Sequence, residues 1–277
     1  MNPLVQRYHA GAVEYARYWA PVLELTAERL IDEVDAVFRG DRLRVVDVGA
    51  GTGTAALAAV RRWPHAEVVA TDAAAGMLEF ARGRAEEAGL AADGRLTFAV
   101  GPAEELPLPS GSFDVAVSSF VLQLVSDRLA ALTEIRRILR PGGLLVYVTW
   151  LDRESRKPFR AAEEFDEAVY DLNVDEPDES DEDIAGDVRS SRAAADELRR
   201  AGFIRASARD EDLIYTWTMD AYLDYKLMYD ERSLISTLSA DQTAELERNV
   251  RDRLSRLAPS DFRWHAPIVF ARAFAPT

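Results

Sequence analysis

The chain has 277 residues and contains no cysteine, so disulfide bonds, thiolate metal sites and a cysteine nucleophile are excluded. Its longest apolar runs fall short of the about 20 residues that a membrane-spanning helix needs. The N-terminal sequence MNPLVQRYHAGAVEYARYW lacks the basic-then-apolar pattern of a secretory signal peptide. The chain has 48 Asp and Glu residues against 33 Lys and Arg residues, of which only two are lysines. It also has three histidines. We therefore expect a cytoplasmic protein.

The charge balance is strongly acidic, with a formal net charge of −15 and an isoelectric point of about 4.7. Such a surface repels the phosphate backbone of nucleic acids and the anionic face of a membrane. We therefore expect no nucleic-acid partner and no membrane partner, and a small molecule is the expected substrate. The oligomeric state is left open between a monomer and a homodimer.

The most informative stretch is LRVVDVGAGTGTAALA, residues 43–58. A short apolar run is followed by three glycines that alternate with small residues, and then by an Ala- and Leu-rich segment. This order of strand, glycine turn and helix brings a ligand close to bare backbone at a helix N-terminus. No Gly-Lys-Ser or Gly-Lys-Thr follows, which excludes a phosphate-binding loop, and the third glycine of a dinucleotide-binding G-x-G-x-x-G turn is missing.

Strand-like and helix-like patterns alternate after the glycine turn. Strands separated by helices imply crossover connections, and hence a parallel sheet with helices on both faces. The predicted strands are residues 43–48, 67–71, 95–100, 112–118, 144–150, 206–217 and 266–274, and the predicted helices after the turn include residues 74–88, 127–139, 190–201 and 219–257.

The flanking regions differ from this α/β domain of residues 41–277. Residues 1–40 show helical spacing and are predicted to form a helical cap of two helices, with a break near Pro21. Residues 151–189 are predicted to be an acidic loop, because the tract at 171–187 has almost no apolar residues; the tract is either a solvated segment or a lid that attracts a cationic substrate. Residues 219–264 form a helical insertion between the last two strands.

The pattern Asp47-x-Gly49-x-Gly51-x-Gly53 resembles the first motif of the class I S-adenosylmethionine-dependent methyltransferases. Other segments agree with this resemblance at the expected places, and the whole is similar to the small-molecule methyltransferases of the ubiquinone/menaquinone-biosynthesis type. They are Asp72 at the end of the second strand, residues 103–107, residues 113–118 and the Leu-Arg-Pro-Gly-Gly segment at 139–143. The match covers residues 43–150.

The resemblance implies a Rossmann-like α/β fold with a seven-stranded, mostly parallel sheet, helices on both faces and an antiparallel last strand. It also implies S-adenosylmethionine as cofactor and S-adenosylhomocysteine as product. The glycines would keep side chains away from the ligand, and Asp47 would orient the turn. The implied cofactor-binding residues are Asp47, Gly49, Ala50, Gly51, Gly53, Thr54, Asp72, Ala73, Met77, Ala103, Glu104, Ser118 and Gln123.

Several of these roles have an alternative. An ionised Asp72 is a pure acceptor and suits both ribose hydroxyls, but it would also suit the N-cap of the following helix. Met77 would pack on the adenine or simply belong to the core. The family's usual Gly-Asp-Ala turn is Gly-Pro-Ala here, so Pro102 supplies no acid, and Glu104 is the candidate replacement.

The implied reaction is an in-line methyl transfer, without a covalent enzyme intermediate, to an oxygen, nitrogen or carbon atom of a small molecule. A general base is needed only if the acceptor must lose a proton; His9 is the candidate, and the other two histidines are expected at the surface or at a strand end. The candidate acceptor pocket comprises Tyr15, Trp19, Ser119, Phe120, Tyr222 and Tyr229.

Two other functions are kept as alternatives. One is a non-catalytic module that binds S-adenosylmethionine or S-adenosylhomocysteine and acts through a partner. The other is a nicotinamide-dependent oxidoreductase, which the glycine spacing disfavours. No metal site is expected, since the acidic tract lacks the spacing of a calcium-binding loop.

Overall fold

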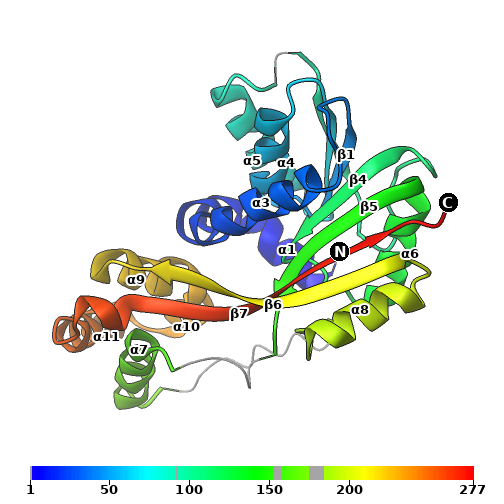
Figure 1. Ribbon diagram of the computed structural model, residues 1–277. Helices are drawn as coiled ribbons and strands as arrows, with labels where there is room; N and C mark the ends of the chain where they lie inside the picture. The colour runs from blue at the N-terminus through cyan, green and yellow to red at the C-terminus, as the bar shows by residue number, and fades with distance from the viewer. Residues whose placement is uncertain (1, 92, 153–157, 175–183) are drawn as a thin grey trace.

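The computed structural model describes residues 2–91, 93–152, 158–174 and 184–277. Seven strands form one sheet in the order β3-β2-β1-β4-β5-β7-β6 (Figure 1). Only β7 runs antiparallel to its two neighbours; the other neighbouring pairs are parallel. The predicted fold class is therefore confirmed. The strands are β1 Arg44–Val48, β2 Glu67–Asp72, β3 Leu96–Val100, β4 Phe113–Ser119, β5 Leu139–Trp150, β6 Ile204–Thr216 and β7 Arg263–Phe274.

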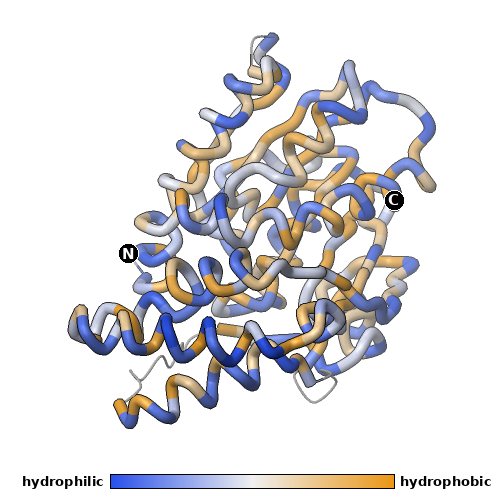
Figure 2. The backbone as a smooth tube through the Cα atoms, turned by 90° about the vertical axis from the view of Figure 1, so that its left-hand side faces the viewer, coloured by the Kyte–Doolittle hydropathy of each residue, from blue (hydrophilic) through white to orange (hydrophobic). Residues whose placement is uncertain are grey.

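Helices cover both faces of the sheet (Figure 1). Helices α3 (Ala20–Asp35), α4 (Thr54–Arg62) and α5 (Ala75–Glu87) lie on one face, and α6 (Arg128–Ile138) and α8 (Ser191–Arg200) lie on the other. Each face has its own apolar core, because the parallel strands are buried on both sides and alternate their side chains between the two cores. In Figure 2 the hydrophobic stretches gather toward the middle of the molecule, while the helices at its periphery alternate between hydrophilic and hydrophobic residues.

The N-terminal region is more continuous than expected. It contains α1 (Pro3–Ala10), α2 (Ala12–Glu14) and the π-helical segment η1 (Tyr15–Trp19), which runs directly into α3. The predicted break near Pro21 is absent: this proline lies in the first turn of α3, directly after the π-helical segment, where the regular hydrogen-bond ladder is already interrupted. The interruption falls instead at Gly11, which ends α1.

A group of helices, here called the helical lobe, stands beyond the end of the β6–β7 ribbon (Figure 1). These two strands pair as far as Thr216 and Arg263, whereas β5 ends opposite Ile268, so the ribbon projects past the main sheet. The lobe contains α7 (Arg160–Asp171), α9 (Met219–Tyr225), η3 (Lys226–Asp230), α10 (Arg232–Thr237), α11 (Ala240–Leu254) and η4 (Pro259–Phe262). The predicted helical insertion between the last two strands is therefore present, broken into shorter helices.

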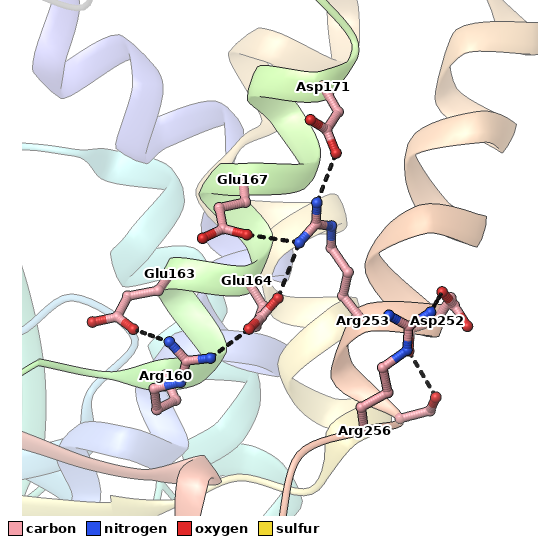
Figure 3. A network of polar contacts seen from close by, with 9 residues as sticks. Arg160, Glu163, Glu164, Glu167, Asp171, Asp252, Arg253 and Arg256 are labelled. Carbon is pink, nitrogen blue, oxygen red and sulfur yellow. Dashed lines mark hydrogen bonds and ion pairs between the residues drawn. The ribbon is translucent and has the colours of Figure 1, made fainter.

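Helix α7 lies within the segment that was expected to be an acidic loop. It forms because apolar residues at helical spacing, such as Phe165 and Val169, give it one buried face. Figure 3 shows how its acidic face is used: Arg253 of α11 contacts Glu164, Glu167 and Asp171 at 3.1, 2.7 and 2.7 Å. These pairs orient α7 along α11. The acidic tract beyond α7 lies mostly outside the described residues.

Within the described parts of the chain, no helix has both the length and the apolar character that crossing a membrane requires.

Candidate functional site

The glycine turn between β1 and α4 is organised by Asp47. One carboxylate oxygen of Asp47 accepts a hydrogen bond from the Ala56 N–H at 2.8 Å, and the side chain is almost fully buried. The other oxygen, Oδ1, is buried without a partner. Burial raises the pKa of this carboxyl to about 7, the Ala56 hydrogen bond opposes the rise, and the charge of Asp72 adds to it. Asp47 therefore ties the turn to the helix that follows.

The three glycines of the turn all have positive φ angles but serve different purposes. A Cβ atom at Gly49 would lie 2.3 Å from the side chain of Val121, and one at Gly53 would lie 2.9 Å from Ala81. Packing within the protein therefore already requires glycine at these two positions. Gly49 also borders the cavity described below, so its predicted role beside a ligand stays a prediction. At Gly51 the nearest atom is Cε1 of Tyr15, at 3.9 Å. Gly51 is thus the position that opens toward free space.

Asp72 lies at the end of β2, beside the glycine turn. Its two carboxylate oxygens accept hydrogen bonds from the N–H groups of Gly51 and Ala74, both at 2.8 Å. Burial raises the pKa of this carboxyl, and the two backbone donors lower it. Ala74 rather than Asp72 holds the N-cap position of α5, although the carboxylate does bond its N–H. Each oxygen keeps a further lone pair for a ligand hydroxyl.

A cavity of about 710 Å³ extends from this carboxylate along the carboxyl ends of the strands. This volume is in the range of small-molecule sites, which is about 300–1,000 Å³. The N-terminal helices cover it, and residues 184, 186 and 187 border it on one side. The predicted donor-site residues in its lining are Gly49, Gly51, Asp72, Ala73, Met77, Ala103, Glu104 and Gln123.

One end of the cavity, near the turn after β3, is polar. Glu104, the candidate replacement for the missing acid, accepts hydrogen bonds from the N–H and hydroxyl groups of Ser126 at 3.0 and 3.1 Å. These bonds fix its carboxylate in the cavity wall beside Ala103. Met77, 2% exposed, belongs to a small apolar cluster with Ala74 and also borders the cavity, so its two alternative roles are compatible.

The other end of the cavity is aromatic. Phe120 follows β4 with a φ of +54°, which is strained for a bulky residue. Its carbonyl accepts a hydrogen bond from Gln123 at 2.7 Å, and its ring lies 4.0 Å from that of Trp150. Trp19 approaches Trp150 at 6.2 Å between ring centroids. Of the predicted acceptor residues, Tyr15, Trp19, Ser119 and Phe120 line the cavity.

The remaining predicted site residues lie elsewhere. Asp47, Ala50, Gly53, Thr54 and Ser118 support the turn or the strands without bordering the cavity. Tyr222 packs against Phe159 and Trp217 inside the helical lobe, and Tyr229 contacts Tyr15 from the lobe side. His9 accepts a hydrogen bond from the Gly76 N–H at 2.8 Å, so the structure uses it to join α1 to α5. His65 and His265 lie near Asp41 and Asp212 respectively.

Some residues of the cavity lining were not predicted from the sequence. Trp150 is the last residue of β5, and the rule that ligands bind at the carboxyl ends of parallel strands would have identified it. Tyr8 of α1 was not named, whereas residues 184, 186 and 187 belong to the acidic tract that was considered as a lid. That stretch reaches the cavity through backbone bonds from Ala185 to Val125 and from Gly186 to Gln123, which no local sequence pattern encodes.

The fold and the site together define a nucleoside-cofactor-binding domain of the Rossmann-like class, with a glycine turn, an acid on the next strand and a cavity at the strand ends. More specifically, residues 46–147 match the family model described as "Methyltransferase domain". Residues 46–147 are thus identified as a methyltransferase domain, and the resemblance inferred from the motifs is confirmed over that stretch.

Named relatives extend the comparison. The malonyl-[acyl-carrier protein] O-methyltransferase of Xylella fastidiosa is 40% identical over 153 residues, covering 53% of this chain and 50% of the relative. The demethylmenaquinone methyltransferase of Thermus thermophilus is 40% identical over 113 residues, covering 41% of this chain and 50% of the relative. The chain therefore spans about half the length of each of these relatives.

A solved structure agrees at the level of the fold. Phosphoethanolamine N-methyltransferase 2 of Haemonchus contortus, in complex with phosphomonomethylethanolamine and S-adenosylhomocysteine, superposes with a TM-score of 0.56 at 19% identity. The alignment covers 97% of this chain and 58% of that one.

Proposed function

We propose that the whole chain is an enzyme that transfers the methyl group of S-adenosylmethionine to an oxygen, nitrogen or carbon atom of a small molecule. The observation that carries this proposal is a single cavity with two unlike ends. One end presents Gly51 and the Asp72 carboxylate, and the other presents the rings of Phe120 and Trp150. A donor and an acceptor that share one enclosed space are what a direct transfer requires.

The residues present fit the cofactor. In this proposal the Asp72 oxygens accept the ribose hydroxyls, and the bare backbone at Gly51 lets the methionine part pass close to the turn. Asp47 holds the turn from beneath through the Ala56 N–H, which keeps the Gly51 backbone in place beside the cavity. Met77 and Ala103 border the end where the adenine would lie. S-adenosylhomocysteine in the Haemonchus contortus neighbour supports this choice of cofactor.

The chemistry needs little from the protein beyond alignment. S-adenosylmethionine, when bound, would supply a methyl group already activated by its sulfonium: the acceptor's lone pair would form the new bond to carbon, and the electron pair of the broken carbon–sulfur bond would stay on the sulfur as a neutral thioether. The aromatic end of the cavity holds the acceptor in line and excludes water. No histidine, lysine or arginine stands among the described residues of the cavity lining. A base in this lining would therefore be a carboxylate, such as Glu104, Glu105 or Asp187, and we propose acceptors that pass a proton to such a carboxylate or to solvent, or that need to lose none.

The identity of the acceptor is open, because the relatives differ in theirs. Their names specify malonyl-[acyl-carrier protein] and demethylmenaquinone, and the structural neighbour's name specifies a phosphorylated ethanolamine. An acyl-carrier-protein substrate is thus a further candidate beside a free small molecule. A cytoplasmic location stays a prediction from composition, and the choice between monomer and homodimer stays open.

The proposal is tested by incubating the purified protein with S-adenosylmethionine carrying a labelled methyl group and a panel of small phenols, quinols, amines and carboxylic acids. We expect label in at least one acceptor and stoichiometric S-adenosylhomocysteine. Cofactor binding without transfer to any member, including an acyl-carrier-protein thioester, would favour the alternative of a non-catalytic binding module.

A further inference from the structure

Tyr15 occupies a special place over the donor turn. Its Cε1 atom lies 3.9 Å from the position of a Cβ at Gly51, closer than any other atom outside the immediate chain neighbours. Tyr15 also borders the same cavity as Gly51 and Asp72. A ligand that follows the turn from the Asp72 carboxylate toward the aromatic end must therefore pass beside the Tyr15 ring.

The orientation of this ring is fixed by its neighbours. Tyr15 meets Tyr8 of α1 and Tyr229 of η3, both at 6.0 Å between ring centroids and at angles of 72° and 73°. It is also the first residue of the π-helical segment η1, a type of irregularity that is frequent at functional sites. The ring is thus held by the N-terminal helices on one side and by the helical lobe on the other.

The electrostatic surroundings favour a cation next to this ring. Burial and the nearby Tyr8, Asp72 and Asp47 all raise the pKa of the Tyr15 hydroxyl, so Tyr15 is uncharged at neutral pH and its neighbours include two carboxyls. No basic side chain among the described lining residues competes for the ring. The π face of a neutral aromatic ring attracts a cation within about 6 Å of its centroid.

We propose that Tyr15 is a positioning residue whose ring contacts the charged sulfonium centre of S-adenosylmethionine and so makes the site prefer the methyl donor over the neutral-sulfur product. This inference rests on the proposed function and deepens it. The ring would hold the donor in place for transfer. Because the sulfur loses its positive charge on transfer, the site would bind the product S-adenosylhomocysteine more weakly than the donor.

The proposal is tested by measuring the dissociation constants of both ligands by calorimetry, without any turnover. We expect Tyr15→Leu to weaken binding of S-adenosylmethionine about 3- to 30-fold and that of S-adenosylhomocysteine less than about 2-fold. Tyr15→Phe keeps the ring and should keep the preference. Tyr229→Leu is the matched control, because it removes a ring of the same cluster that does not border the cavity; any loss there should affect both ligands equally.

A graded series covers the case in which Tyr15→Leu fails to fold. Phenylalanine, and then its mono-, di- and trifluorinated analogues, are incorporated at position 15, which keeps the ring's shape while its π face becomes less negative. The affinity for S-adenosylmethionine should fall stepwise with each fluorine, while that for S-adenosylhomocysteine stays level. Equal changes for both ligands, or a flat series for both, would overturn the role of Tyr15.

This failure is distinguishable from a failure of the proposed function. If the wild-type protein binds neither ligand, the cofactor assignment itself is wrong. If it binds both and the variants at position 15 leave their ratio unchanged, the assignment stands and only the role of Tyr15 is lost.

Discussion

The donor end and the acceptor end of the cavity are built in different ways. The donor end comes from one short segment: Asp47, Gly51 and Asp72 lie within 26 residues, at the ends of the paired strands β1 and β2. The acceptor end collects Trp19 from the N-terminal cap, Phe120 after β4 and Trp150 at the end of β5. Adjacent parallel strands bring the first group together automatically, whereas the second depends on long-range packing.

This difference separates two kinds of constraint. The donor end uses backbone atoms and two carboxylates, so it tolerates few residue types at each position. The acceptor end uses ring contacts and tolerates many combinations of similar volume. The comparisons agree with this contrast, since the family model matches residues 46–147, which include the donor residues, and the two relatives carry names with different acceptors. Substitutions at the two ends should therefore affect donor binding and acceptor turnover separately.

The largest effect is expected for Gly51→Val. A branched side chain at a φ of +53° is strained, and it would also point into the cavity. We expect the affinity for S-adenosylmethionine to fall roughly 100-fold or more, measured by calorimetry. Gly111→Val is the matched control, because Gly111 has a φ of +59° and free space around its Cβ position, far from the cavity. Equal losses in both variants would show that backbone strain alone is responsible.

Asp72→Ala should have the next largest effect on the donor end. Each charged hydrogen bond to the ribose that is lost should weaken cofactor binding roughly 10- to 100-fold, again measured by calorimetry. Asp114→Ala removes a carboxylate that likewise accepts a backbone N–H, from Arg44 at 2.8 Å, but at the opposite end of the strands. Its cofactor affinity should stay at the wild-type value. Unchanged affinity in Asp72→Ala would refute the ribose assignment.

A smaller and selective effect is expected at the acceptor end. Trp150→Leu should lower kcat/KM for whichever acceptor the panel assay reveals by about 5- to 20-fold, because one ring of the wall is lost. The affinity for S-adenosylmethionine should change less than about 2-fold. Trp264→Leu serves as control, because the Trp264 ring lies next to that of Trp150, 5.9 Å away between centroids, but does not border the cavity. If Trp150→Leu lowered the affinity for S-adenosylmethionine as much as it lowered kcat/KM, Trp150 would contribute to donor binding as well, and the division into a donor end and an acceptor end would be wrong.

The smallest effect concerns stability. The pKa of Asp47 is raised to about 7 in the folded chain, above its ordinary value of 3.8. Between these two values the folded state binds more protons than the unfolded state, so this group makes stability fall as the pH rises from about 4 to 7. Asp47→Asn keeps the acceptor for the Ala56 N–H and removes the titration.

The ligand-free Asn variant should therefore lose less stability than the wild type between pH 5 and pH 8, by at least about 1 kcal/mol. Urea unfolding at the two pH values measures this difference. Parallel pH profiles for the two proteins would mean that Asp47 titrates normally.

The sequence predicted most of the fold because its signals are local. Several patterns indicate a turn or a strand end by themselves: the glycines with small neighbours, the acid at position 72 and the Arg-Pro-Gly-Gly segment at 140–143. The helix within the supposed acidic loop was missed because its apolar face is short and its other face shares the charge of the tract. Charge alone is therefore a poor guide to whether such a segment folds.

The candidate site was predictable only in part, because only some of its residues carry a local sequence signal. Asp72 and Gly51 were found from spacing, whereas Tyr222 was assigned to the pocket because an aromatic residue in a helical insertion has no signal for the side on which it is buried. In the structure it packs within the helical lobe. Trp150 was overlooked although its place at the carboxyl end of a predicted parallel strand is a signal for the site. Its ring contacts with Trp19 and Phe120, which come from far away in the sequence, were not predictable.

Methyl transfer at this site requires that the cavity at Gly51 and Asp72 binds S-adenosylmethionine. Calorimetric titration of the purified wild-type protein with S-adenosylmethionine, and separately with NAD, tests it most directly. We predict one S-adenosylmethionine bound per chain and no heat of binding with NAD. Binding of NAD without any binding of S-adenosylmethionine would contradict the account.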